Sequence, residues 1–218
     1  MLLRLRPSVR LANGMPGFVL EHVLKELRRV CLKPVRLVWT APVGPDLLLT
    51  SLSLADFLLQ GRVRHELRTD GSDLNEECVS FLARREVEVT VALDGPPEIH
   101  DGNRGAGTHA RALLGLKSVQ QKGAPVRVRC TVTPRTLPWA ESVLDYLDDL
   151  GSDEIDFVPA VELVGSQVRY GLEPGEFGRF LSRVYLRARG RPARTRVRLL
   201  DSLGRRMLGR VCADCRFG

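Results

Sequence analysis

The sequence predicts an α/β fold in which a parallel sheet, covered by helices, curves into an open barrel. Runs rich in β-branched residues alternate with amphipathic segments along the chain, a pattern typical of repeated strand–loop–helix units. Several of these runs end in turns that contain glycine or proline. With 218 residues and 44% hydrophobic composition, the chain is expected to bury one substantial core.

The elements follow from this alternation. Helices are expected at residues 17–32, 53–60, 75–84, 108–122, 138–150 and 174–188. Strands are expected at residues 35–39, 64–68, 87–93, 126–132 and 154–161. Thr108 is expected to cap the helix that follows Gly107, and Gly123 and Gly151 to end the helices before them in the left-handed conformation.

Composition excludes several classes of protein. The net charge is +7, but the arginines are scattered outside residues 187–198 and few aromatic residues lie among them, so nucleic-acid binding is not expected. Five cysteines without regular pairing argue against a secreted disulfide framework. We find no signal peptide and no run long enough to span a bilayer, which predicts a soluble cytoplasmic protein without membrane contact.

Residues 89–101 are the most informative segment. An alternating β-branched run ends in Asp94-Gly95-Pro96-Pro97, which indicates a strand whose carboxyl end turns sharply. Ligands of α/β barrels sit at that end of the strands. Asp94 is expected to accept hydrogen bonds from backbone amides, and Gly95 to adopt a conformation that other residues resist. Thr69 and Gly71, at the end of the preceding strand, are expected to line the same mouth.

Several segments resemble, in the same order, parts of the radical S-adenosylmethionine (SAM) enzymes, especially the anaerobic sulfatase-maturating enzymes and related peptide-modifying members with a SPASM extension. These segments are residues 69–77, 89–104, 123–133 and 156–162. The resemblance implies an incomplete (β/α) TIM-like barrel of the radical SAM type whose first strand is missing. It also implies a partial barrel over residues 1–190 and, over residues 191–218, a remnant of the start of a SPASM-type auxiliary-cluster extension.

SAM and a [4Fe-4S] cluster are the cofactors that this resemblance implies. Arg104 stands where the family has the arginine that pairs with the cofactor carboxylate, a task that suits a planar guanidinium fork; the other interpretation is a solvated loop arginine. Ala92 occupies the usual place of a serine that reaches the same carboxylate, so one contact is expected to be missing. The amine-binding loop, at residues 39–45, lacks its adjacent glycines and its glutamate. His100 and Asp101 form either an acid/base pair or, as we favour, a structural bridge made by His100.

The family's Cys-x3-Cys-x2-Cys loop has no counterpart in this sequence. The cysteines are Cys31, Cys78, Cys130, Cys212 and Cys215, and no three of them have that spacing. Cys212 and Cys215 are the candidate metal ligands, because Cys212 resembles the first ligand of an auxiliary cluster and a two-residue gap occurs in many metal sites. The other three fall within apolar patterns and are expected to pack in the core.

These observations predict a degenerate or truncated relative of enzymes that oxidise Cys or Ser in a protein substrate, catalytically incomplete on its own. The alternatives are a non-catalytic module that binds a peptide or a partner enzyme, and a fragment of a longer radical SAM enzyme. The expected partners are a sulfatase-like protein or peptide and a partner radical SAM subunit. Without a first strand, the strand at residues 35–39 is expected to expose an edge that residues 2–11 or self-association must cover.

Overall fold

The computed structural model describes residues 8–11, 15–31, 33–40, 45–164, 167–189 and 195–201. The strands are β1 (Ser8–Leu11), β2 (Val35–Thr40), β3 (Val63–Thr69), β4 (Glu88–Ala92), β5 (Val126–Val132), β6 (Glu154–Pro159), β7 (Val161–Val164), β8 (Gln167–Tyr170) and β9 (Arg196–Val197). The helices are α1 (Gly17–Val30), α2 (Pro45–Leu59), α3 (Glu76–Arg84), α4 (Pro97–Arg104), α5 (Thr108–Gln121), the 3₁₀ turn η1 (Leu137–Trp139), α6 (Ala140–Asp149) and α7 (Pro174–Arg189). Among the described residues, no helix is long and apolar enough to cross a bilayer.

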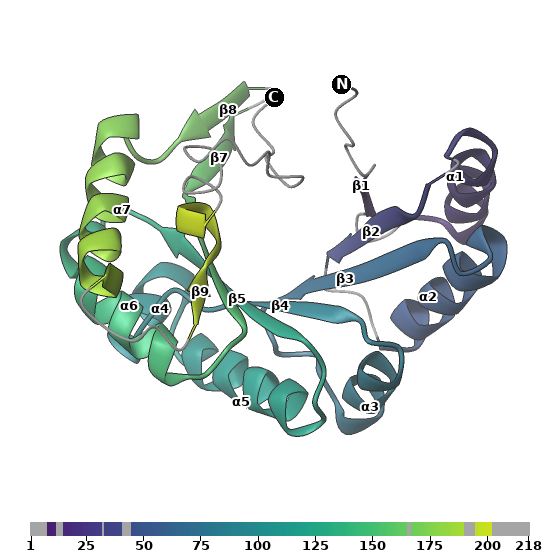
Figure 1. Cartoon of the computed structure of the whole chain (residues 1–218), viewed down its shortest axis with the longest axis horizontal. Coiled ribbons are helices and arrows are strands. Elements are labelled where there is room, and N and C mark those ends of the chain that lie inside the picture. Colours follow the sequence, from purple (N-terminus) through teal and green to yellow (C-terminus); the bar gives the residue numbers. More distant parts are fainter. Residues whose placement is uncertain are drawn as a thin grey trace.

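Seven of the strands form one sheet in the order β1-β2-β3-β4-β5-β6-β9, and every neighbouring pair is parallel. Its two edge strands, β1 and β9, do not pair with each other, so the barrel stays open. Figure 1 shows the strands as the inner layer of an arc, with the helices along its convex side. The antiparallel hairpin β7–β8 forms a separate small sheet. The predicted α/β class with an incomplete barrel is therefore confirmed.

The apolar core lies between the sheet and the outer helices. In β5, every second residue is buried, from Val126 to Val132, whereas Arg127 and Arg129 between them face the hollow of the arc. The sequence alternates in this way because successive side chains of a strand point to opposite faces. Leu116 of α5 and Leu147 of α6 are fully buried in the same core.

Charged side chains line the concave face. Arg36 contacts Glu66 at 2.8 Å and Glu88 at 3.1 Å, and Arg127 pairs with both Glu88 and Glu154. Arginines on β2 and β5 thus neutralise glutamates on β3, β4 and β6, although Glu66 and Glu88 are register partners on neighbouring strands. Partly buried networks of this kind satisfy charged groups that an isolated pair leaves unsatisfied. The open barrel is lined by ion pairs where a closed barrel has apolar layers.

The structure corrects several predicted elements. We expected no strand before the one at residues 35–39, but β1 pairs in parallel with β2 through Ser8↔Arg36 to Leu11↔Trp39. The edge of β2 is thus covered by part of the segment at residues 2–11, one of the two covers that the sequence predicted. Residues 191–218 were expected to belong to an extension outside the barrel, yet Arg196–Val197 pairs with β6 in the barrel sheet. The hairpin β7–β8 and helix α4 were missed. Cys78 and Cys130 are buried as expected, but Cys31 is only half-buried.

Candidate functional site

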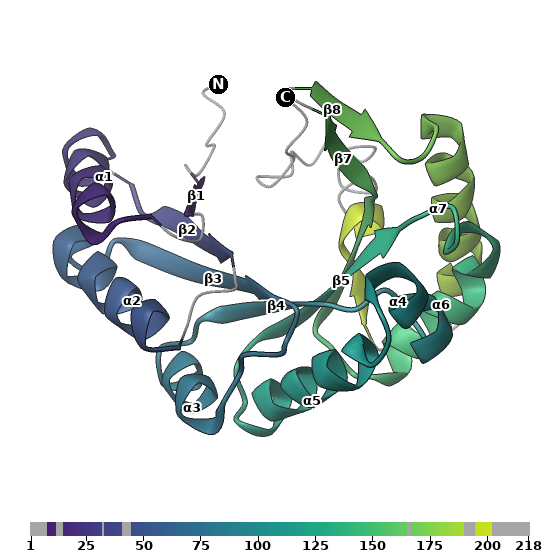
Figure 2. The ribbon, with the colours of Figure 1, turned by 180° about the vertical axis from the view of Figure 1, so that it is seen from behind.

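The loop after β4 reaches the mouth of the barrel and turns at once into α4. Asp94 is 1% exposed, and Gly95 adopts a φ of 128°, as expected for this turn. A Cβ on Gly95 would also lie 3.0 Å from the side chain of Val143 on α6, so both the conformation and the space favour glycine. Proline residues begin the helix at its first positions, where no backbone N–H is needed. Figure 2 shows α4 beside α5 and α6 at this end of the sheet.

Arg104, the last residue of α4, makes a bidentate contact with the carboxylate of Asp94. Its Nε lies 2.8 Å from Oδ2 and its Nη2 lies 3.0 Å from Oδ1. Nη2 also donates to Thr131 Oγ1 of β5 at 3.1 Å, and the backbone N–H of Thr131 donates to Asp94 Oδ1 at 2.8 Å. Asp94 does accept a backbone amide, as expected, but from β5 rather than from its own turn. The role of Arg104 toward a cofactor carboxylate stays a prediction, and its Nε and Nη2 already donate to Asp94 and Thr131.

Asn103 and two threonines extend this network. Asn103 Nδ2 lies 3.4 Å from Asp94 Oδ2 and 3.3 Å from Thr136 Oγ1, and Thr133 Oγ1 donates to Asn103 Oδ1 at 3.0 Å. The carboxyl ends of β4 and β5 are therefore tied to α4 by polar side chains on every side of Asp94. Polar networks of this kind hold a rim in one geometry.

His100 and Asp101 have separate structural tasks. The backbone N–H of Asp94 donates to His100 Nδ1 at 3.1 Å, so His100 bridges the loop to the strand, as we favoured. The Asp101 carboxylate accepts the backbone N–H groups of Gly107 and His109, both at 2.8 Å. These hydrogen bonds lower the pKa of Asp101. Asp101 thus caps α5, whereas Thr108, the predicted cap, forms no cap of this kind.

Thr69 and Gly71 follow the preceding strand and lie against α5. Thr69 Oγ1 accepts the backbone N–H of Gly71 at 2.9 Å. Gly71 has a φ of 86°, and a Cβ there would lie 3.0 Å from the backbone of Ala112. A Cβ on Gly115 would come within 2.4 Å of Gly71 O. No pattern in the sequence indicated this close approach, because Gly115 resembles any other glycine inside a helix.

A cavity of about 320 Å³ opens among these elements. It is lined by Asp70, Ser72, His100, Arg104, Thr108 and Arg111. His100 and Arg104 were among the site residues that the sequence predicted. Asp70 and Ser72 of the loop after β3 form one wall, whereas Thr69 and Gly71 of the same loop are not among the lining residues. Ala92 ends β4 opposite Arg129 and is not among the lining residues. Cavities at the carboxyl ends of parallel strands are the usual ligand sites of such folds.

A second polar chain, missed by the sequence, supports the end of β2. Trp39 Nε1 donates to His65 Nδ1 at 3.0 Å, and His65 Nε2 lies 3.1 Å from Asp56 Oδ1. Asp56 also contacts Arg85. Trp39 opens the predicted amine-binding segment, whose residues 41–44 lie outside the described residues.

The described residues do not fit a [4Fe-4S] cluster. Three thiolates must converge on such a cluster. The described cysteines lie on three separate elements: Cys31 at the end of α1, Cys78 on α3 and Cys130 on β5. Burial raises the pKa of both Cys78 and Cys130, which disfavours their thiolate forms. In the described ranges, no group of three His, Cys, Asp or Glu side chains is placed to hold a metal ion. Cys212 and Cys215 lie outside these ranges.

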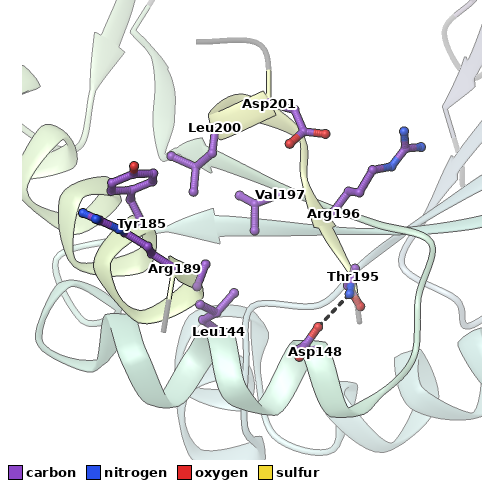
Figure 3. A pocket seen from close by; sticks show the side chains of 10 residues that line it. Leu144, Asp148, Tyr185, Arg189, Thr195, Arg196, Val197, Leu200 and Asp201 are labelled. Carbon is purple, nitrogen blue, oxygen red and sulfur yellow. Dashed lines mark hydrogen bonds between the residues drawn. The ribbon is translucent and has the colours of Figure 1, made fainter. Parts of the chain in front are cut away.

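Another cavity, of about 370 Å³, lies between α6, α7 and β9 (Figure 3). Its wall includes Leu144, Tyr185 and Val197, and Asp148 accepts the backbone N–H of Thr195 at 2.8 Å. β9 starts beside Glu154, the first residue of β6, so this cavity is at the amino-terminal end of the strands. It contains none of the predicted site residues.

Comparisons with known proteins agree with this architecture. Over 132 residues the chain is 24% identical to the cysteine-type anaerobic sulfatase-maturating enzyme of Clostridium perfringens, a match that covers 57% of this chain and 35% of that enzyme. The corresponding enzyme of Clostridium novyi is 20% identical over 130 residues, covering 56% and 35%. The chain thus spans about a third of the length of these curated relatives. No protein-family model matches the sequence.

Solved structures show the same fold. The structure of anSMEcpe with bound AdoMet superposes with a TM-score of 0.76 at 20% identity, covering 92% of this chain and 59% of that one. Streptococcus suis SuiB superposes with a TM-score of 0.66 at 14% identity, covering 88% and 47%. In sequence and in fold, this chain is related to the radical SAM enzymes of the anaerobic sulfatase-maturating type.

Proposed function

We propose that this chain is a radical SAM-like barrel that makes no radical of its own and binds a peptide or protein partner at its mouth. One observation carries the proposal. The segment that joins β1 to α1, Ala12-Asn13-Gly14-Met15-Pro16, contains no cysteine. The family resemblance puts its three cluster thiolates after the first strand. Because β1 is the first strand of this barrel, the segment after it corresponds to the family's cluster loop, and it contains no thiolate ligand for iron.

Two further features support a binding role. The mouth is held in one geometry by hydrogen bonds among Asp94, Arg104 and Asn103. Proteins of similar fold also bind peptides: solved structures contain anSMEcpe with bound AdoMet and the Cp18Cys peptide, and SuiB bound to the precursor peptide SuiA. A chain that keeps the mouth and loses the cluster loop is suited to hold such a segment.

The test has two arms on the purified full chain. In the first, anaerobic reconstitution with iron and sulfide is followed by iron analysis and electron paramagnetic resonance with and without SAM. We expect no stoichiometric cluster and no signal that SAM shifts; a SAM-sensitive cluster would show that the chain is a radical enzyme.

In the second arm, peptides selected from a displayed random library are measured by fluorescence anisotropy against the wild type and Arg104→Ala. We expect peptides that bind the wild type and lose affinity on Arg104→Ala. Lys117→Ala, on the exposed face of α5, is the matched control. Selection of no binder, or of binders equally tight on both variants, contradicts a peptide site at the mouth.

A further inference from the structure

His100 has a buried hydrogen-bond donor without a partner. Its side chain is fully buried, and its Nδ1 accepts the backbone N–H of Asp94. Because that N–H always donates, Nδ1 carries no proton and the neutral ring holds its proton on Nε2. Burial lowers the pKa of His100, which keeps the ring neutral. Nε2 has no hydrogen-bond partner among the described residues, an arrangement that is costly unless a ligand completes it.

The same cavity offers a cation and an acceptor. Arg111, exposed on the first turns of α5, makes no hydrogen bond or close ion pair with a described residue, whereas Arg104 is engaged by Asp94. Asp70 Oδ1 is held by the backbone N–H and the hydroxyl of Ser72, at 2.9 and 2.7 Å. Burial opposes the ionisation of Asp70, but the hydrogen bonds from Ser72 and the charges of Arg104 and Arg111 lower its pKa overall. Its second oxygen remains an acceptor.

These groups select one kind of ligand. Arg111 and the Nε2 proton of His100 suit a carboxylate, because both donate to an anionic oxygen. Asp70 repels an isolated anion but accepts an N–H next to it. We infer that the cavity between the loop after β3 and the start of α5 binds the carboxyl terminus of a peptide, with the terminal carboxylate on Arg111 and His100 and the last amide N–H on Asp70. The inference rests on the proposed peptide-binding function and names the end of the peptide that is recognised.

The minimal probe is N-acetylglycylglycine, compared with its amide. Titration of the ¹⁵N-labelled full chain is followed by the amide shifts of residues 70–72 and 100–111. We expect saturable shifts with the free acid and, under the same conditions, binding weaker by roughly tenfold or more with the amide, because a charge-assisted contact is lost. Arg111→Ala should weaken binding of the acid by a similar factor, whereas Lys117→Ala should leave it unchanged.

A second variant separates the donor from the fold. His100→Asn keeps an acceptor for the Asp94 amide and removes the Nε2 proton. This variant should bind N-acetylglycylglycine more weakly, while its amide spectrum shows that it is still folded.

Equal affinity for acid and amide, or an affinity unaffected by Arg111→Ala, overturns the inference. Inorganic phosphate that binds as tightly as the acid would show a simple anion site. SAM that shifts the same residues in an Arg111-dependent way would assign the cavity to the cofactor. If selected peptides bind with either terminus, this inference fails and the peptide module stands; if no peptide binds, the proposed function fails as well.

Discussion

Arg104 holds Asp94 through two N–H donors on one edge of its guanidinium, with Nε to Oδ2 at 2.8 Å and Nη2 to Oδ1 at 3.0 Å. The pair joins two residues ten positions apart, one just after β4 and the other at the end of α4. The Asp94 side chain is 1% exposed and that of Arg104 is 29% exposed, so the contact lies at the border between the core and the mouth. This one pair sets the shape of the rim.

Arg104→Ala should therefore destabilise the chain by about 1–3 kcal/mol, because Asp94 keeps its buried charge and loses its cation. Partial exposure of Arg104 places the loss below that of a fully buried pair. Urea unfolding measures the change, with Lys117→Ala as the surface control. In the double-mutant cycle with Asp94→Ala, the second substitution should cost much less once the first is made. Additive losses would show that the two side chains are not coupled.

The sequence predicted the parallel sheet, most helices and the turn at Gly95, because these depend on short-range periodicity and on local turn chemistry. It missed α4, whose eight residues begin with a proline and contain a glycine, because so short a helix shows no clear hydrophobic period. It named Asp94 and Arg104 separately but did not pair them. It also missed Gly115 and the chain from Trp39 to Asp56, because such contacts depend on how distant segments pack.

SAM affinity offers a second test of the same pair. If a cofactor carboxylate binds Arg104, it competes with Asp94 for the guanidinium, so we expect weak binding to the wild type. Arg104→Ala should weaken that binding by roughly tenfold to a hundredfold, the usual effect of losing a charge-assisted contact. Asp94→Asn should strengthen it, since the competing charge is gone. Calorimetry that gives one affinity for all three proteins would exclude Arg104 as the carboxylate ligand.

Stability should fall as the pH drops below about 6.5, the ordinary pKa of histidine. Burial lowers the pKa of His65, His100 and His109 in the folded chain. Below pH 6.5 the unfolded chain therefore binds more protons than the folded chain, so protonation favours unfolding. The stabilisation is fully present above the pKa of the unfolded histidines and is lost as the pH falls through the lower pKa values of the folded state. Urea unfolding at pH 7.5 and pH 5.5 measures the difference. His65→Gln should reduce it, whereas substitution of the exposed His22 should not; equal stability at both pH values would contradict the prediction.

Gly115→Ala should disturb the mouth from the outside. The added methyl group would lie 2.4 Å from Gly71 O, a backbone atom that cannot rotate away, so α5 and the loop after β3 must separate. Overpacking of this kind typically costs about 1–3 kcal/mol.

Gly178 on α7 is the matched control, because a Cβ there meets nothing within 4 Å. Gly178→Ala should stabilise its helix by up to about 1 kcal/mol through helix propensity alone. Since Gly71 adjoins Asp70 and Ser72, Gly115→Ala should also shift the amide signals of residues 70–72, and Gly178→Ala should not. Unchanged stability and spectra in Gly115→Ala would mean that the loop and α5 do not meet as the structure describes.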